Sequence, residues 1–181
     1  PNYPRIGFVV LLTIFVGGCM NERSPEPRSQ RFQFVETTIA KSQSAILAGK
    51  ISCRELVNGY LQRIKMLDKS SGINAITQVN ANATEVADAI DQSIAAGEVQ
   101  PDLFCVPVLV KDNYDTYDMV TTGGSIVLKN SIPFDDAFMI KKLRTEGAII
   151  PAKTNMPEFA ISPVPYLHFP LCKISSCATA Q

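Results

Sequence analysis

The sequence lacks an excess of charge of either sign. Its 181 residues hold 17 lysines and arginines against 17 aspartates and glutamates, so the formal net charge at pH 7 is zero. This balance argues against a nucleic-acid partner bound through a basic face. The length suits one domain of ordinary size. A composition of 46% hydrophobic and 19% charged residues indicates a globular chain.

The cysteines lack a regular pattern. The five of them stand at positions 19, 53, 105, 172 and 177. None of the spacings matches a zinc site, and an odd number gives no complete disulfide framework. Cys172 and Cys177 are better explained as incidental than as a metal pair. We therefore expect no metal in this protein.

The apolar run near the N-terminus is too short to span a bilayer. IGFVVLLTIFV has 11 residues, whereas a membrane-spanning helix needs roughly 18 or more. The run follows Arg5 and leads through VGGC to Cys19. A basic residue, a short apolar core and small residues before a cleavage site describe a secretory signal peptide over residues 1–19. VGGC also resembles a bacterial lipobox, in which Cys19 is lipidated and attaches the protein to a membrane. Both interpretations stay open, and both predict export.

Four helices are predicted beyond a polar linker, which covers residues 20–34 and contains two prolines. The clearest helix begins with a capping box, S-x-x-E, at Ser52 and Glu55. Apolar residues then recur at helical spacing up to Leu67. The other helices are expected within residues 37–50, 83–97 and 137–147. In the first, Ile39, Ile46 and Leu47 should face inward, and Gly49 should end the helix. In the second, Val86, Ile90 and Ile94 should face inward; in the third, Ile140 and Leu143 should do so, with Asp135 or Asp136 as the cap.

Three strands are predicted between these helices. Residues 73–79, INAITQV, alternate between apolar and polar. VPVLV at 106–110 is a continuous apolar run that suits a strand covered on both faces, and AII at 148–150 is a second such strand. The order strand, helix, strand implies a parallel crossover. The predicted class is therefore α/β, with helices on both faces of the sheet.

Lys111 stands directly after the buried strand and raises the question of why a lysine is placed there. By alternation it shares a sheet face with Leu109, at the carboxyl end of the strand. Ligands of open α/β sheets bind beyond the carboxyl ends of strands. A lysine drawn out of water loses its charge more easily, and a neutral lysine can act as a general base. Position alone, however, favours the simpler interpretation that Lys111 ends the strand and points into solvent without a catalytic role.

The residues around Lys111 change that balance. VPVLVKDNYDTYDMVTTGGS, at 106–125, resembles the signature of the amidase signature family, approximately G-[IV]-P-V-x-[VI]-K-D-N-x-D followed by T-T-x-G-S. DDAFMIKKLRTEGAIIPAKTNMPEFA, at 135–160, is similar to the same family's helix, strand and T-N-M-x-E-F-A loop. The resemblance covers roughly residues 35–161. Cys105 and Ala152 stand where the family usually has glycine.

The resemblance implies a fold and a reaction. The fold is a mixed β-sheet between helical layers, of which residues 35–161 are the amino-terminal portion. The reaction is hydrolysis of the amide bond of a small-molecule substrate by a Ser–cisSer–Lys triad, with Lys111 as the base. Backbone N–H groups of a glycine-rich loop would hold the oxyanion. The family needs no metal or organic cofactor.

The family's two serines lie further along than residue 160, in a segment rich in glycine and serine. Residues 162–181 form an irregular tail with three prolines. Ser175 and Ser176 lack the neighbouring glycines that such a turn needs. The sequence therefore also predicts a truncated, inactive portion of an amidase. The amidase component of a tRNA-dependent amidotransferase belongs to the same family, but the export signal argues against this cytoplasmic work.

Other residues are weaker candidates for a site. The resemblance places Gly124 and Ser125 near the substrate pocket, together with the loop that reaches Ala160. The segment GGS at 123–125 could be interpreted as a loop that binds an anion, but it does not match the Walker pattern. A simple turn explains it better. His168 is the only histidine and lies in the irregular tail, which makes a Ser-His-Asp triad improbable.

Overall fold

The computed structural model describes residues 32–161. The predicted signal peptide with Cys19, most of the predicted linker and the whole tail from 162 to 181 lie outside the described residues. Phe32 and Phe34, in the last part of the predicted linker, pack against the helices that follow. The ring of Phe34 meets that of Tyr60 edge-on at a centroid distance of 5.7 Å. The packed part of the chain therefore includes the last residues of the segment predicted as a linker.

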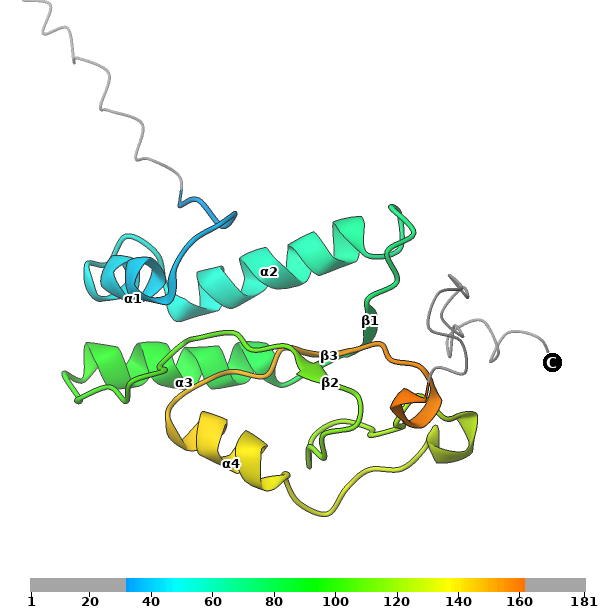
Figure 1. Cartoon of the computed structure of the whole chain (residues 1–181). Coiled ribbons are helices and arrows are strands. Elements are labelled where there is room, and N and C mark those ends of the chain that lie inside the picture. Colours follow the sequence, from blue (N-terminus) through cyan, green and yellow to red (C-terminus); the bar gives the residue numbers. More distant parts are fainter. Residues whose placement is uncertain (1–31, 162–181) are drawn as a thin grey trace, which may run out of the picture. The chain divides into compact units, whose positions relative to one another are not determined.

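Helices, strands and two short 3-10 turns follow one another along the described part (Figure 1). In chain order they are α1 (Ile39–Leu47), α2 (Cys53–Leu67), β1 (Ile76–Val79), α3 (Ala83–Ala95), β2 (Val110–Lys111), η1 (Ile126–Leu128), α4 (Phe138–Thr145), β3 (Ala152–Thr154) and η2 (Glu158–Ala160). The four predicted helices are confirmed.

The strands form a small mixed sheet in the order β1-β3-β2. β2 and β3 are parallel and α4 connects them, so the predicted crossover is confirmed. β1 runs antiparallel to β3. The strands are shorter than predicted: residues 148–150 are buried, but regular pairing begins at Ala152, preceded by a single bridge between Pro107 and Ile149. The class is α/β.

Helices cover both faces of the sheet, as Figure 1 shows for α2 above and α4 below. Ile149 belongs to the larger apolar cluster, which contains buried residues of α1, α2 and α3. Its neighbour Ile150 belongs to a second cluster with Val110 and Ile140, on the side of α4. Because neighbouring residues of an extended chain point to opposite faces, the two clusters lie on the two sides of this segment.

The beginning of α2 has the predicted capping box. The Ser52 hydroxyl accepts the N–H of Glu55 at 3.0 Å, and the Glu55 carboxylate accepts the N–H of Ser52 at 2.8 Å. These bonds satisfy two backbone donors that a helix leaves unpaired at its start. Leu56 and Val57 then lie fully buried and pack against α3. Local sequence therefore decided both where α2 begins and which side faces inward.

Two expectations about helices are wrong. Of the three apolar residues of α1 predicted to face inward, only Ile46 is buried, while Ile39 and Leu47 are 50% and 62% exposed. Ile39 shares a helix face with Ile46 but lines a cavity instead of packing in the larger cluster. No aspartate caps α4, whose N-cap is Ala137. Asp136 instead accepts the N–H of Tyr117 at 3.0 Å and pairs with Arg144. A tertiary ion pair thus takes the carboxylate that local sequence assigned to the cap.

A disulfide links Cys53, at the start of α2, to Cys105, just before the extended segment that leads to β2. Both residues are buried in the larger cluster. The expectation that the cysteines are merely scattered is therefore wrong for this pair: the two are 52 residues apart in sequence but adjacent in space. Cys105 has a φ of 57°, in the left-handed region that favours glycine.

We expect reduction of this bond to destabilise the protein, because it closes a loop of 52 residues. Chain-entropy arguments give an upper figure of about 4 kcal/mol for a loop of this length. Urea unfolding of the oxidised and reduced chains should show the difference. In a matched Cys53→Ala, Cys105→Ala variant, reductant should change nothing further. Equal unfolding midpoints for the oxidised and reduced wild-type chains would contradict the bond's role.

Candidate active site

Lys111 ends β2 and pairs in register with Thr154 of β3. Its side chain is exposed, as is that of Leu109, while Val110 between them is buried. The predicted alternation is therefore present, and Lys111 lies on the face that Leu109 shares. Within residues 32–161 the Lys111 ammonium makes no hydrogen bond or ion pair. The backbone that carries it is nonetheless fixed, because β2 is hydrogen-bonded to β3.

A second lysine, Lys153, lies on the opposite face of the same sheet. It pairs in register with Val110, so its side chain points away from the face of Lys111. Lys153 is completely buried. Its ammonium donates hydrogen bonds to the carbonyl of Tyr114, at 2.9 Å, and to the hydroxyl of Thr121. A carboxylate oxygen of Asp112 lies 3.7 Å away.

The charge of Lys153 is balanced by the acidic residues of one loop. Burial lowers the pKa of the Lys153 ammonium below its usual value, because desolvation disfavours the charged form. Asp112 opposes this shift most strongly, followed by Asp115 and Asp118. Asp118 also pairs with Arg144 of α4 at 2.8 Å. The loop of residues 112–122 is thus held by one cation from β3 and another from α4.

Asp112, directly after Lys111, connects the sheet to this loop. Its N–H donates to the carbonyl of Thr154 at 3.1 Å, and its carbonyl accepts the N–H of Gly123 at 2.9 Å. Its carboxylate accepts hydrogen bonds from the N–H of Thr122, at 3.3 Å, and from the Thr122 hydroxyl. The side chain is only 1% exposed. The loop therefore leaves the sheet at Asp112 and returns to the same residue.

The T-T-x-G-S segment, which ends at Ser125, contacts the T-N-M-x-E-F-A loop of residues 154–160. The carbonyl of Gly123 accepts the N–H of Phe159 at 2.7 Å, and the Ser125 hydroxyl donates to the Glu158 carboxylate at 2.6 Å. Gly124 has a φ of 79°, and a Cβ at this position would come within 2.8 Å of the carbonyl oxygen of Met156. Only glycine fits this close approach without a shift of the backbone.

The structure thus brings Gly124 and Ser125 together with the loop that ends in Ala160. Ser125 is 1% exposed and hydrogen-bonded to Glu158, whereas Ala160 is exposed. Both segments follow the strand ends that carry Lys111 and Lys153. Their expected place in the wall of a substrate pocket stays a prediction.

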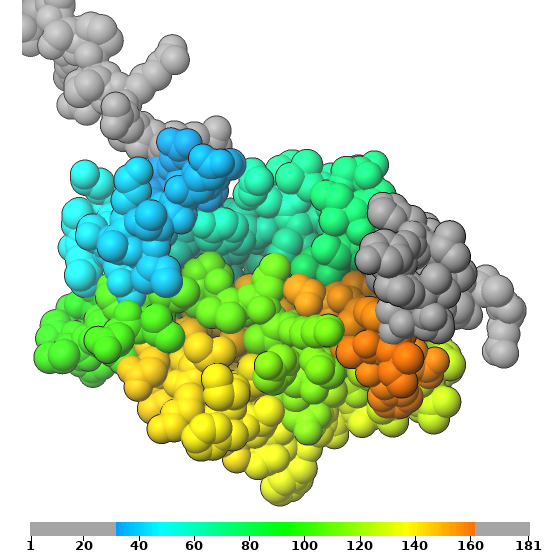
Figure 2. All heavy atoms as spheres, viewed as in Figure 1, coloured from blue at the N-terminus to red at the C-terminus, as the bar shows by residue number. Residues whose placement is uncertain are grey.

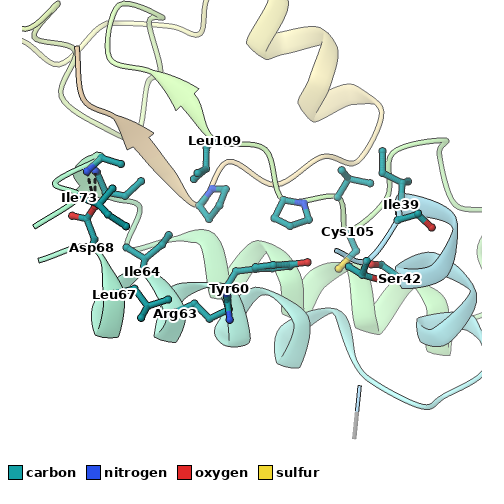
Figure 3. A pocket seen from close by; sticks show the side chains of 17 residues that line it. Ile39, Ser42, Tyr60, Arg63, Ile64, Leu67, Asp68, Ile73, Cys105 and Leu109 are labelled. Atoms are coloured by element: carbon teal, nitrogen blue, oxygen red, sulfur yellow. Dashed lines mark hydrogen bonds between the residues drawn. The ribbon is translucent and has the colours of Figure 1, made fainter. Parts of the chain in front are cut away.

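A cavity of about 510 Å³ lies between α2 and the extended segment that carries Leu109 (Figure 3). The side chains of Tyr60, Ile64 and Leu67 line it from α2, and Leu109 lines it from the sheet side. Asp68 stands at one end, where its carboxylate accepts the N–H groups of Ala75 and Ile76. The lining is mostly apolar, so this cavity offers chiefly packing surface.

Neither a metal site nor a membrane span is found between residues 32 and 161. No three His, Cys, Asp or Glu side chains of that range gather closely enough to hold a metal ion. No helix of that range combines the length and the apolar character needed to cross a bilayer.

Sequence reasoning missed Lys153 and its partner Asp112. A signal was present, because PAKTN repeats the arrangement of VLVKDN: an apolar run, one lysine, then a polar residue and an asparagine. Alternation gives no way to tell the two lysines apart. Only the pairing of Val110 with Lys153 shows that the second lysine points to the opposite face.

Comparison with known proteins agrees with this arrangement. The family model Amidase matches residues 55–164. A glutamyl-tRNA(Gln) amidotransferase subunit of Alkaliphilus metalliredigens is 39% identical over 127 residues, which are 70% of this chain and 26% of the relative. The corresponding protein of Synechococcus sp. is 36% identical over 124 residues, which are 68% of this chain and 25% of the relative.

Solved structures give the same result. The native peptide amidase of Stenotrophomonas maltophilia superimposes with a TM-score of 0.67 at 34% sequence identity, over 70% of this chain and 26% of that one. A bacterial aryl acylamidase of the amidase signature family gives a TM-score of 0.61 at 27% identity, over 68% and 26%. The chain spans about a quarter of the length of the proteins that it matches. On its sequence and its structure, the chain belongs to the amidase signature family.

Proposed function

We propose that this chain is the amino-terminal portion of an enzyme that hydrolyses amide C–N bonds, with Lys111 as the general base. The observation that carries the proposal is the position of Lys111. It is exposed at the carboxyl end of β2, on a backbone fixed by β3 and by the loop that begins at Asp112. Parallel strands of open α/β sheets carry ligand sites beyond these ends.

The reaction that fits this lysine is acyl transfer through serine. Neutral Lys111 takes a proton from a bridging serine, which in turn takes the proton of a nucleophilic serine. The nucleophilic oxygen forms a bond to the amide carbonyl carbon, and the C–N bond breaks as the leaving amine receives the proton. Water then hydrolyses the acyl-enzyme. Both serines are contributions of the full-length enzyme beyond residues 32–161, and the resemblance to the family supports their roles.

The substrate that we propose is a small-molecule amide. No metal or organic cofactor enters the reaction, and no nucleic-acid partner is proposed because the chain has no net charge. Several relatives are components of a glutamyl-tRNA(Gln) amidotransferase. The disulfide between Cys53 and Cys105 favours a different setting, since disulfides persist in exported proteins and are rare in the reducing cytoplasm.

The same disulfide supports export of the protein through residues 1–19. The sequence VGGC supports lipidation of Cys19, which attaches the mature protein to a membrane by its amino terminus. With an ordinary signal peptide the mature protein is secreted. One lipid chain alone binds a membrane only marginally, and stable attachment needs a second signal.

For the 181-residue chain by itself we also propose an alternative: it is a catalytically inactive portion of an amidase. Two observations favour it. Within residues 32–161 β2 is paired on one edge only, by β3. Large apolar side chains also stand exposed, among them Phe134 at 101% and Phe138 at 71%. Exposed edges and apolar surface of this kind favour aggregation.

For the full-length enzyme we expect Lys111→Met to lower kcat on a simple aryl amide by at least about 10²-fold, the usual contribution of a general base. The fold should persist because the side chain is exposed and has no partner within residues 32–161. Lys50→Met, which removes an exposed lysine next to α1, is the matched control and should keep full activity. Near-normal turnover by Lys111→Met would refute the assignment.

For the 181-residue chain we expect no labelling of any serine by a fluorophosphonate that attacks activated serines, because no serine of residues 32–161 is hydrogen-bonded to the Lys111 ammonium. We also expect a broad thermal transition and a tendency to aggregate. Labelling at one serine per chain would show that the chain is active. A sharp, reversible transition of a monomer would show that its fold is complete.

For the amino terminus we expect Cys19→Ser to abolish lipid labelling in a bacterial host and to release the protein from the membrane fraction. Mass spectrometry of the mature amino terminus provides the measurement. An unmodified Cys19 with cleavage elsewhere would leave an ordinary signal peptide and a secreted enzyme.

A further inference from the structure

We propose that Lys153 is a positioning residue for amide hydrolysis, which fixes Lys111 by anchoring the loop that follows it. The inference rests on the proposed role of Lys111 as the base. Lys153 itself does not reach the reacting face, because its pairing with Val110 turns its side chain to the other side of the sheet.

The first step of the argument is the completeness of the Lys153 site. An ammonium has three N–H donors, and here three groups surround it: the Tyr114 carbonyl at 2.9 Å, the Thr121 hydroxyl, and the Asp112 carboxylate at 3.7 Å. The side chain has no exposure to solvent. All three partners belong to the loop of residues 112–122. The Lys153 ammonium therefore contacts this loop at its first residue, in its first turn and near its last residue.

The second step is the connection from this loop to Lys111. Asp112 follows Lys111 directly, and its N–H is bonded to the carbonyl of Thr154 at 3.1 Å. The carbonyl of Lys111 accepts the N–H of Tyr114 at 3.0 Å. A displacement of Asp112 or Tyr114 would therefore rotate the peptide groups that aim the Lys111 side chain. Lys153 contacts both of these residues.

The third step concerns the exposed side of Lys111. Within the described part of the chain, no hydrogen bond or ion pair holds its ammonium, so the direction of the side chain depends on the backbone. A misplacement of about 1 Å in a catalytic group can cost 10²-fold in rate. A buried anchor across the sheet can fix that backbone without occupying the substrate side.

The test uses the full-length enzyme that contains this sequence, with a simple aryl amide as substrate. We expect Lys153→Met to lower kcat per folded molecule at least about tenfold, with KM changed less than twofold. The folded fraction is measured by circular dichroism on the monomer peak. A merely structural lysine would lower the folded fraction and leave kcat per folded molecule unchanged, and this result would overturn the inference.

Two further variants keep the test decisive if Lys153→Met fails to fold. Thr121→Val removes only the hydroxyl that accepts from Lys153 and keeps a side chain of similar size. It should lower kcat per folded molecule severalfold, again with little change in KM, and an unchanged kcat would count against the inference. Lys153→Met combined with Asp112→Asn leaves no unpaired buried charge. The double variant should fold but stay slow, whereas full activity would overturn the anchoring role.

Lys111→Met separates the two proposals. If Lys111→Met is inactive while the Lys153 and Thr121 variants are normal per folded molecule, the proposed function stands and the positioning role fails. If Lys111→Met is active, the proposed function fails, and the inference about Lys153 fails with it. Lys50→Met remains the matched control for the loss of a lysine elsewhere on the surface.

Discussion

A lysine ammonium buried without access to solvent must be surrounded by oxygen atoms, and all the oxygens around Lys153 come from the loop of residues 112–122. Breaking one side of a buried ion pair typically costs about 3–5 kcal/mol, because the remaining charge stays unpaired. The loop therefore has little freedom while Lys153 is in place. Asp112 is hydrogen-bonded to Thr122 and Gly123, and Gly123 is hydrogen-bonded to the loop at 156–160. In Figure 2 the orange surface of this loop lies beside the green and yellow-green surface.

The register of the parallel pair separates two lysines that have similar sequence surroundings. Lys153 is opposite Val110 and points to the side of α4, whereas Lys111 is opposite Thr154 and points to the other side. One face of the sheet thereby carries a fully paired, buried cation. The other carries the exposed side chain of Lys111, which has no hydrogen-bond or ion-pair partner in the described part of the chain. This division suits the general base that we propose for Lys111, since the contacts that hold the fold lie on the opposite face of the sheet.

The disulfide has a related role on the side of α1, α2 and α3. Cys53 is the first residue of α2, and its N–H donates to the Asp91 carboxylate of α3 at 2.7 Å. Cys105 begins the extended segment that leads to Lys111. The bond therefore ties the helical layer to the segment that carries the proposed base. It also agrees with the export that we propose for this protein, because a reducing cytoplasm would keep both cysteines as free thiols.

The sequence by itself determined the features that depend on neighbouring residues. The capping box of α2 and the apolar spacing of α2 and α3 predicted these helices correctly. The run before Lys111, with the helix and second run that follow, predicted the parallel crossover. The motifs around Lys111 and at 135–160 predicted the family. Local signals of this kind act within a few residues, so they can be recognised without the fold.

Tertiary structure alone decided the features that join distant residues. It paired Cys53 with Cys105 across 52 residues, assigned Asp136 to Arg144 rather than to the start of α4, and buried Lys153 against Asp112. It also left Ile39 and Leu47 exposed, although their spacing suits a buried face. The physical reason is common to all of these cases. Which oxygen meets a buried cation, and which face of a helix is covered, depends on the strand register and on the neighbouring element, and neither is encoded in the local pattern.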